Sequence, residues 1–212
     1  MIHSYYTTTN GKVVHDTEFT HVEWLHLSNP TSDEINRVVK HFGFPKDYLS
    51  SVLDPDEVSR HENLELDESE SSSLALFLYP LKVTSNSSDT EYVTRPLAVI
   101  MTAKTVITAA VHTPGFISSM IDNKPNFPIS SANQERFLLD IAWHISSDYI
   151  TYLKEINAKI ETLEDTITKT SKNRQLFVLM SLQKSLVYFS TAIESNHPIF
   201  KRLKAIERFN TD

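Results

Sequence analysis

The stretch Lys184-Ser-Leu-Val-Tyr-Phe-Ser-Thr-Ala-Ile-Glu-Ser-Asn196 decides the fold class of this chain, because it forms half of a long helical hairpin. In this stretch and in the segment before it, apolar residues recur every three or four positions, the spacing of one buried helix face. Two such faces must cover each other or a third surface. The earlier stripe contains Ile145, Tyr149, Tyr152, Ile156, Ile160, Leu163 and Ile167; the later one contains Leu179, Leu182, Leu186, Phe189, Ile193, Phe200 and Leu203, with polar Asn196 at one seam position.

A polar break over residues 168–174 separates the two stripes and predicts an antiparallel turn between two long helices. Pro198 falls inside the second stripe. A proline within a helix removes one hydrogen bond and clashes with the preceding turn, at a cost of about 3 kcal/mol or more. The second helix therefore either bends at Pro198 or ends at Asn196, after which a new helix begins.

The front of the chain carries strand signals instead of long helical stripes. Asn10-Gly11 predicts a tight turn between two strands, because these residues accept the positive φ angles of such turns. Further apolar runs are too short for paired helices and rich in residues that favour strands, and the last two predict a hairpin. These runs cover residues 21–27, 74–79, 92–101 and 105–112.

Two shorter helices are also predicted in this front part. Thr31 or Ser32 can cap the first, with Glu34 completing a capping box from Thr31 and Gly43 ending the helix. A second short helix is expected from residue 116 to 122. We therefore expect an α+β fold, in which a mixed β-sheet layer with flanking helices precedes a long antiparallel helical hairpin.

Composition limits the possible classes of protein. The chain has 212 residues and 40% hydrophobic content, which suffices for a core. It contains no uninterrupted apolar run of about 18 to 20 residues and no signal-peptide pattern at the N-terminus, so no membrane-spanning or targeting segment is expected. It has no cysteine, so any metal must be bound by oxygen or imidazole ligands.

The charge balance favours cations over nucleic acid as partners. The chain carries 27 acidic and 20 basic side chains, a formal net charge of −7. Acidic residues are concentrated at Asp54–Glu57 and again over residues 62–70. Such runs are usually solvated loops, and a metal-collecting role is the alternative interpretation.

No enzyme signature is present, so we expect no catalytic activity. With only three glycines the chain cannot form a phosphate-binding loop or a dinucleotide fingerprint, and it has neither a zinc-protease pair nor a nucleophile elbow. His144 and Asp148 are the one pair spaced to share a cation on a helix, although a hydrogen-bonded or solvated pair is more common. Trp24 and Trp143 are interpreted as core anchors.

Several motifs follow one another over most of the chain. They are Val22–Leu27 with Asn29-Pro30, Ser32–Glu34, Leu53–Glu57 with Arg60, Leu97–Met101 with Thr105–Thr108, and Leu186–Ile193 with Asn196. Together, and in this order, these motifs resemble the cytoplasmic N-terminal domain of the CorA-type magnesium and cobalt channels. The family's Gly-Met-Asn tripeptide is absent, and the chain is expected to stop before any membrane segment.

This resemblance implies a regulatory, divalent-cation-sensing domain on the cytoplasmic face of the cell membrane. Residues 1–128 would form the α/β part of a funnel, and residues 129–212 the helical hairpin with the start of a stalk helix. The full-length protein would be a homopentamer, attached to the membrane only through a missing C-terminal segment. A regulatory Mg2+ or other divalent cation between neighbouring subunits would hold the pore closed.

The resemblance also suggests metal ligands. The family's funnel-side acid lies in or near the loop between the two central strands, where this chain offers Asp89 and Glu91. Asp212 at the chain end is a poor substitute for the stalk-side acid. The alternative is a freestanding soluble scaffold that binds a protein partner through its helical hairpin; Gly-Met-Asn after an apolar segment in the parent gene would decide between the two.

Overall fold

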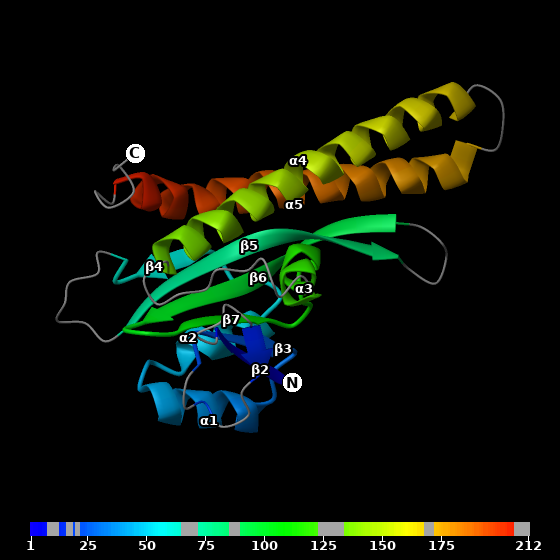
Figure 1. Cartoon of the computed structure of the whole chain (residues 1–212). Helices are drawn as coiled ribbons and strands as arrows, with labels where there is room; N and C mark the ends of the chain where they lie inside the picture. The colour runs from blue at the N-terminus through cyan, green and yellow to red at the C-terminus, as the bar shows by residue number, and fades with distance from the viewer. Residues whose placement is uncertain are drawn as a thin grey trace.

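The computed structural model describes residues 1–7, 13–15, 19, 22–64, 72–84, 90–122, 134–167 and 172–205. In this part of the chain, seven strands form one mixed sheet with helices on both faces (Figure 1). The strands are β1 (Ile2–Thr7), β2 (Val13–His15), β3 (Trp24–Ser28), β4 (Arg60–Glu62), β5 (Ser72–Thr84), β6 (Thr90–Thr102) and β7 (Val106–Ala110).

The strand order across the sheet is β2-β1-β3-β7-β6-β5-β4. Neighbouring strands are antiparallel except β3 and β7, which run parallel and pair Trp24 with Val106. The expected central strands and the β6–β7 hairpin are confirmed. Both β5 and β6 have 13 residues and extend beyond their outer neighbours, since β4 pairs only as far as Leu76 and β7 only as far as Ala98. We call this two-stranded extension, residues 77–84 and 90–97, the ribbon.

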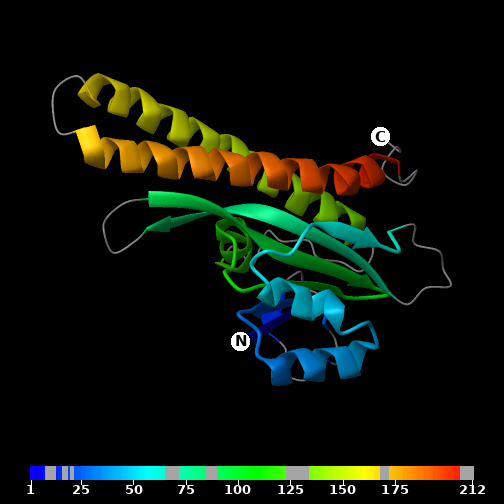
Figure 2. The ribbon, with the colours of Figure 1, turned by 180° about the vertical axis from the view of Figure 1, so that it is seen from behind.

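The sheet separates two hydrophobic cores, because successive residues of a strand point to opposite faces. The helical elements that cover the sheet are α1 (Ser32–Phe42), α2 (Asp47–Ser50), the 3-10 turn η1 (Ser51–Leu53), α3 (Gly115–Asp122), α4 (Gln134–Ile167) and α5 (Lys172–Ala205). In β5, Leu74 and Leu76 enter the core beneath α1 and α2, whereas Ala75 and Phe77 enter the core beneath α3, α4 and α5. Figures 1 and 2 show the two faces of the sheet from opposite sides.

Helix α1 begins and ends where its capping residues predict. The Thr31 hydroxyl accepts from the Glu34 N–H at 3.3 Å, and the Glu34 carboxylate accepts from the Thr31 N–H at 2.9 Å. This is the reciprocal pair of a capping box. Gly43 then adopts φ 78°, a left-handed conformation that costs glycine little and ends the helix.

The long hairpin is confirmed, and both of its helices use the sheet as their third surface. Helices α4 and α5 have 34 residues each, and the buried positions of α5 follow alternating three- and four-residue steps. The prediction that Ile193 lies in the buried seam is wrong, because Ile193 is 42% exposed while the smaller Ala192 lies against the sheet. The buried seam consists of Leu182, Ser185, Phe189, Ala192, Asn196, Ile199 and Leu203.

Pro198 lies inside α5, which continues to Ala205, so the alternative in which the helix ends at Asn196 is wrong. Pro198 is exposed. The carbonyl of Glu194, four residues earlier, is therefore on the solvent side of the helix, where water can replace the missing N–H donor.

The two tryptophans have different environments. Trp24 is 2% exposed, and its indole N–H donates to Thr108 Oγ1 at 2.9 Å, which confirms its role as a core anchor. The same prediction for Trp143 is wrong, since this side chain is 66% exposed on α4 and contacts the ring of His144 edge-on. The predicted Asn10-Gly11 turn, the side chain of Ile167 and most of the acidic run 62–70 lie outside the described residues.

Candidate functional site

One of the two predicted metal ligands, Glu91, lies near the end of the ribbon. Glu91 is exposed on β6, opposite Val83 of β5. Asp89 and Asp212 lie outside the described residues. Within the described part of the chain, no group of three or more His, Asp or Glu side chains is placed to hold a metal ion. Glu91 therefore supplies one exposed carboxylate, and a metal site that includes it needs a further ligand from another part of the chain or from a second molecule.

Another carboxylate near the ribbon, that of Glu155, already accepts hydrogen bonds from protein groups. Glu155 of α4 accepts hydrogen bonds from Lys82 Nζ at 2.7 Å and from the Tyr92 hydroxyl at 2.9 Å. The hydrogen bond from Lys82 is the main reason why the pKa of Glu155 lies below its usual value. Lys159 adds a second cation 5.0 Å from the centre of the Tyr92 ring. This cluster ties α4 to the ribbon and leaves little capacity for a metal.

Polar residues of α5 satisfy the open edges of the ribbon. Asn196 accepts from the Leu78 N–H at 2.9 Å and donates to the Leu78 carbonyl at 2.7 Å, in the manner of a neighbouring strand. The same carbonyl accepts from the Tyr149 hydroxyl at 3.0 Å. On the other strand, Ser185 accepts from the Tyr92 N–H at 3.2 Å. The polar seam position of the sequence is thus a sheet-edge cap.

This capping explains how the ribbon tolerates Pro96. Leu78 lies opposite Pro96, and the backbone groups of Leu78 are used by Asn196, so the two residues form a non-hydrogen-bonded pair. Pro96 therefore removes no ladder bond between β5 and β6. A further contact sets the position of α5 along the edge, because the hydroxyls of Ser195 and Ser59 are hydrogen-bonded.

The acidic segment Asp54–Glu57 folds as a turn. Asp54 accepts from the Asp56 N–H at 2.9 Å. Glu57 pairs with Arg60 at 3.1 Å, and the same guanidinium lies 3.2 Å from Glu62 and 3.5 Å from Asp47. Arg60 thus partly neutralises three carboxylates, which favours a structural role for the segment over metal collection.

His144 and Asp148 lie on the side of α4 that faces α3. The imidazole of His144 stacks on the ring of Phe116, with centroids 5.2 Å apart and planes 4° from parallel. Burial raises the pKa of Asp148, and the charge of His144 partly opposes this rise. Stacking on Phe116 explains the position of the His144 side chain as a packing interaction. A cation shared between His144 and Asp148 stays a prediction.

The outer face of α5 exposes several large apolar side chains. Among the described helices, α5 contains one stretch, Gln175–Lys204, that is long and apolar enough to cross a membrane. The stretch is not an uninterrupted apolar run, because polar residues and Lys184 and Glu194 lie within it. Only 22% of its most apolar window is buried, since the sheet covers a single face. The exposed apolar residues of α5 are Leu176, Phe177, Met180, Val187, Tyr188 and Ile193.

A sheet covered on one face by a long helical hairpin is the fold of the CorA soluble domain. The chain belongs to the CorA-like Mg2+ transporter protein family, whose model matches residues 20–212. The family consists of transporters, and the resemblance carried by the sequence motifs is thereby confirmed. No curated protein matches the chain.

Solved structures agree with this assignment. The complete CorA magnesium transporter from Methanocaldococcus jannaschii superimposes with a TM-score of 0.77 at 20% identity, covering 97% of this chain and 63% of that one. Its soluble domain gives 0.73 at 20% identity, with 92% and 76% covered. The ZntB cytoplasmic domain from Vibrio parahaemolyticus gives 0.68 at 14% identity, with 95% and 78% covered. At these identities the likeness establishes the fold.

Proposed function

We propose that this chain is the cytoplasmic, divalent-cation-sensing part of a magnesium or cobalt channel of the CorA type. Membership of a Mg2+ transporter family over residues 20–212 carries the proposal. The chain spans 63% of the length of the complete CorA transporter, so the pore, and with it transport, would belong to sequence outside this part. Residues 1–128 would serve as the funnel wall, and residues 129–212 as the hairpin leading to the stalk. No catalysis is proposed.

Assembly into a homopentamer is the second element of the proposal. The exposed apolar face of α5, which includes Phe177 and Met180, is a surface that a second copy can cover. Each chain has a net charge of −7, so copies brought together in a ring repel one another. Without the membrane segments that the proposal places outside this part of the protein, we expect this assembly to be weak in dilute solution.

A regulatory Mg2+ can relieve that repulsion. Mg2+ keeps several of its waters and needs only one or two protein carboxylates, so a site shared between copies can use few residues of each. Glu91 is exposed at the end of the ribbon, where a neighbouring molecule can approach it. We therefore assign Asp89 and Glu91 as candidate ligands of a cation that bridges two subunits.

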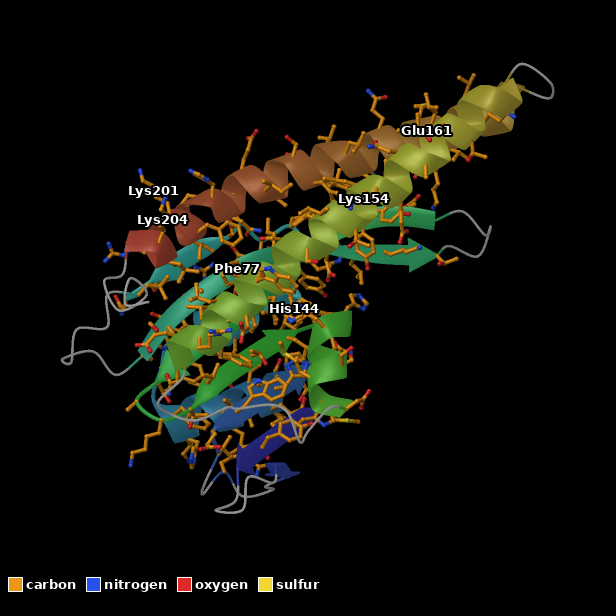
Figure 3. The ribbon with its side chains drawn as sticks, turned by 45° about the horizontal axis from the view of Figure 1, so that its top comes forward. Phe77, His144, Lys154, Glu161, Lys201 and Lys204 are labelled. Carbon is orange, nitrogen blue, oxygen red and sulfur yellow. The ribbon has the colours of Figure 1, made fainter. Side chains whose placement is uncertain are left out.

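Sedimentation velocity tests the cation bridge. We expect rising MgCl2 to increase the sedimentation coefficient more than NaCl of matched ionic strength, because screening acts equally in both salts. Asp89→Asn combined with Glu91→Gln should abolish the magnesium-specific step. The matched control is Glu161→Gln, an exposed carboxylate on α4 (Figure 3). Identical responses to the two salts would refute the bridge.

The same apolar face of α5 favours one alternative, a freestanding scaffold that binds a different protein. Sequence beyond Asp212 in the parent gene separates the two candidates. Two apolar segments of about 20 residues, with Gly-Met-Asn after the first, would support the channel. Their absence there would favour the scaffold.

A further inference from the structure

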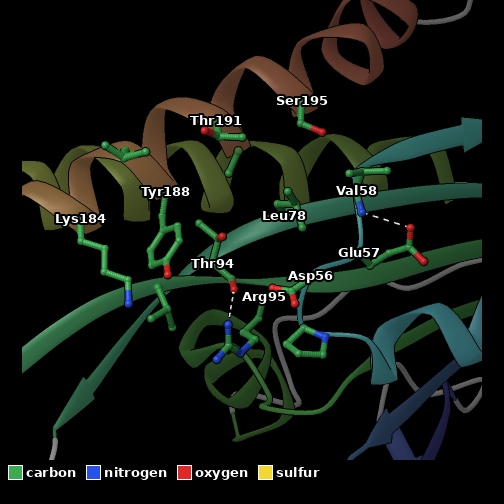
Figure 4. A pocket seen from close by; sticks show the side chains of 14 residues that line it. Asp56, Glu57, Val58, Leu78, Thr94, Arg95, Lys184, Tyr188, Thr191 and Ser195 are labelled. Atoms are coloured by element: carbon green, nitrogen blue, oxygen red, sulfur yellow. Dashed lines mark hydrogen bonds between the residues drawn. The ribbon is translucent and has the colours of Figure 1, made fainter.

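A groove of about 600 Å³ lies between α5, the ribbon and the turn that precedes β4 (Figure 4). Its volume falls within the roughly 300 to 1,000 Å³ typical of pockets for small molecules. The groove is distinct from the candidate cation ligands. Its β6 residues are Val93, Thr94 and Arg95, whereas Glu91 lies further along the strand.

Two cationic side chains from different elements enter this groove. Arg95 comes from β6, and Lys184 descends from α5 on the same side as Tyr188 (Figure 4). Arg95 is half-buried and donates from Nη1 to the carbonyl of Thr94 at 2.7 Å. Neither cation forms an ion pair with a carboxylate among the described residues. A guanidinium carries five N–H donors, so Arg95 retains donors for an anion.

The two carboxylates that line the groove, those of Asp56 and Glu57, neutralise these cations only in part. The Glu57 carboxylate pairs with Arg60 at 3.1 Å and also accepts from the Val58 N–H at 3.1 Å. Asp56 is exposed and forms no ion pair with another described residue. Because Glu57 is paired with Arg60, the two cations of the groove face one unpaired lining carboxylate, Asp56, and this local excess of positive charge attracts anions although the whole chain carries a net charge of −7.

The remaining wall combines an aromatic ring with apolar side chains. Tyr188 is 38% exposed, and the Lys184 ammonium lies 5.5 Å from the centre of its ring. Val187 is 59% exposed beside it, and Leu78 closes the base. A ligand ring can stack on Tyr188 while an anionic group attached to it reaches the two cations.

We propose that this groove binds a small molecule with the chemistry of a mononucleotide, which has a phosphate at one end and a planar ring at the other. The phosphate lies against Arg95 and Lys184, the ring packs on Tyr188, and sugar hydroxyls donate to Asp56. Arginine suits this task because its planar donors match phosphate oxygens. The inference does not depend on the proposed cation sensing, since no residue is shared between the two sites.

Isothermal titration calorimetry with adenosine 5′-monophosphate tests the proposal, in buffer containing a chelator so that no metal bridges ligand and protein. We expect saturable binding to the whole chain and at least about tenfold weaker binding of adenosine, which lacks the phosphate. Arg95→Gln and Lys184→Gln should each weaken the binding of the monophosphate by about tenfold or more, because each removes one charged contact. The matched control is Lys201→Gln, an exposed cation of α5 outside the groove (Figure 3), which should leave the affinity unchanged.

Three outcomes would overturn the proposal. They are equal affinities for adenosine and its monophosphate, an unchanged affinity in Lys184→Gln, and an equal loss in Lys201→Gln. Lys184 is exposed and makes no ion pair with another described residue, so its variant should keep the fold, as a thermal melt can verify. If no ligand binds and Tyr188→Lys abolishes self-association, a second copy covers the groove and the ligand site is refuted.

Discussion

At the scale of single residues, His26 is a titratable group enclosed in the core. Its Nδ1 lies 2.9 Å from Thr108 Oγ1, and its Nε2 lies 3.0 Å from Thr113 Oγ1. Burial is the main cause that lowers the pKa of His26 to about 3, and the charges of His3 and the N-terminus add to it. The imidazole is therefore neutral in the folded protein at pH values where it is protonated in the unfolded chain.

This difference predicts a loss of stability in mild acid. Between pH 6.5 and pH 3 the unfolded state binds a proton that the folded state does not, so the free energy of unfolding falls as the pH falls. The expected contribution of His26 is about 2 kcal/mol on going from pH 8 to pH 5, at about 1.36 kcal/mol per pKa unit. Urea unfolding of the wild type and of His26→Gln across this range measures it. Equal pH dependence in both proteins would contradict the prediction.

Asn196 offers a second test at this scale. We expect Asn196→Ala to lower the free energy of unfolding by about 2–4 kcal/mol, because it leaves the buried N–H of Leu78 without a partner and removes one donor from its carbonyl. Urea denaturation measures the change. The neighbouring His197→Ala is the control, since His197 is exposed and should change stability by less than about 0.5 kcal/mol. A similar loss in both variants would show that the edge cap is not the cause.

At the scale of elements, α4 provides a matched pair of isoleucines. Ile156 is 0% exposed against the sheet and α5, whereas Ile150 on the same helix is 55% exposed. We expect Ile156→Asp to cost several kcal/mol, because it buries a charge without a partner. Ile150→Asp should cost less than about 1 kcal/mol. Thermal melts followed by circular dichroism compare the two, and equal melting temperatures would show that the predicted stripe is not a packing surface.

Periodicity predicted the elements better than it predicted which residue of a helix touches the sheet. The Thr31 capping box and the Gly43 stop depend on local backbone chemistry, which neighbouring residues determine almost alone. The seam of α5 depends on how closely the helix approaches the sheet. A stripe drawn through large residues therefore selected Ile193, while Ala192 occupies the buried position. Trp143 was misplaced for the same reason, since size alone does not decide burial.

The candidate site was harder to predict than the fold. Asn196 was recognisable as a polar residue on an apolar stripe, but its partner Leu78 is a backbone position 118 residues away. The groove cations Arg95 and Lys184 belong to different elements and carry no local motif. Glu155 is likewise joined to Lys82 across 73 residues, a pairing that only the packing of α4 on the ribbon creates.

At the scale of the whole molecule, the apolar outer face of α5 should govern association. We expect self-association that rises with protein concentration, and we expect Phe177→Glu combined with Met180→Glu to suppress it, because two charges would be buried in the contact. Light scattering over a concentration series measures this. Trp143→Glu, an exposed aromatic on α4, is the control that should leave association unchanged. A loss of association in the control alone would place the contact on α4.

The parallel pairing of β3 with β7 constrains the order of events during synthesis. Trp24 and Val106 lie about 80 positions apart, so the three N-terminal strands have no central partner until the later residue has left the ribosome. At about 5–20 residues per second, the delay is about 4–16 s. During that time the edge of β3 that later pairs with β7 has unpaired backbone N–H and C=O groups, whereas α1 and α2, which cover Leu25 and Leu27 in the finished protein, have already been synthesised. This open edge of the nascent chain is therefore accessible to chaperones and to strand pairing with other chains until β7 emerges.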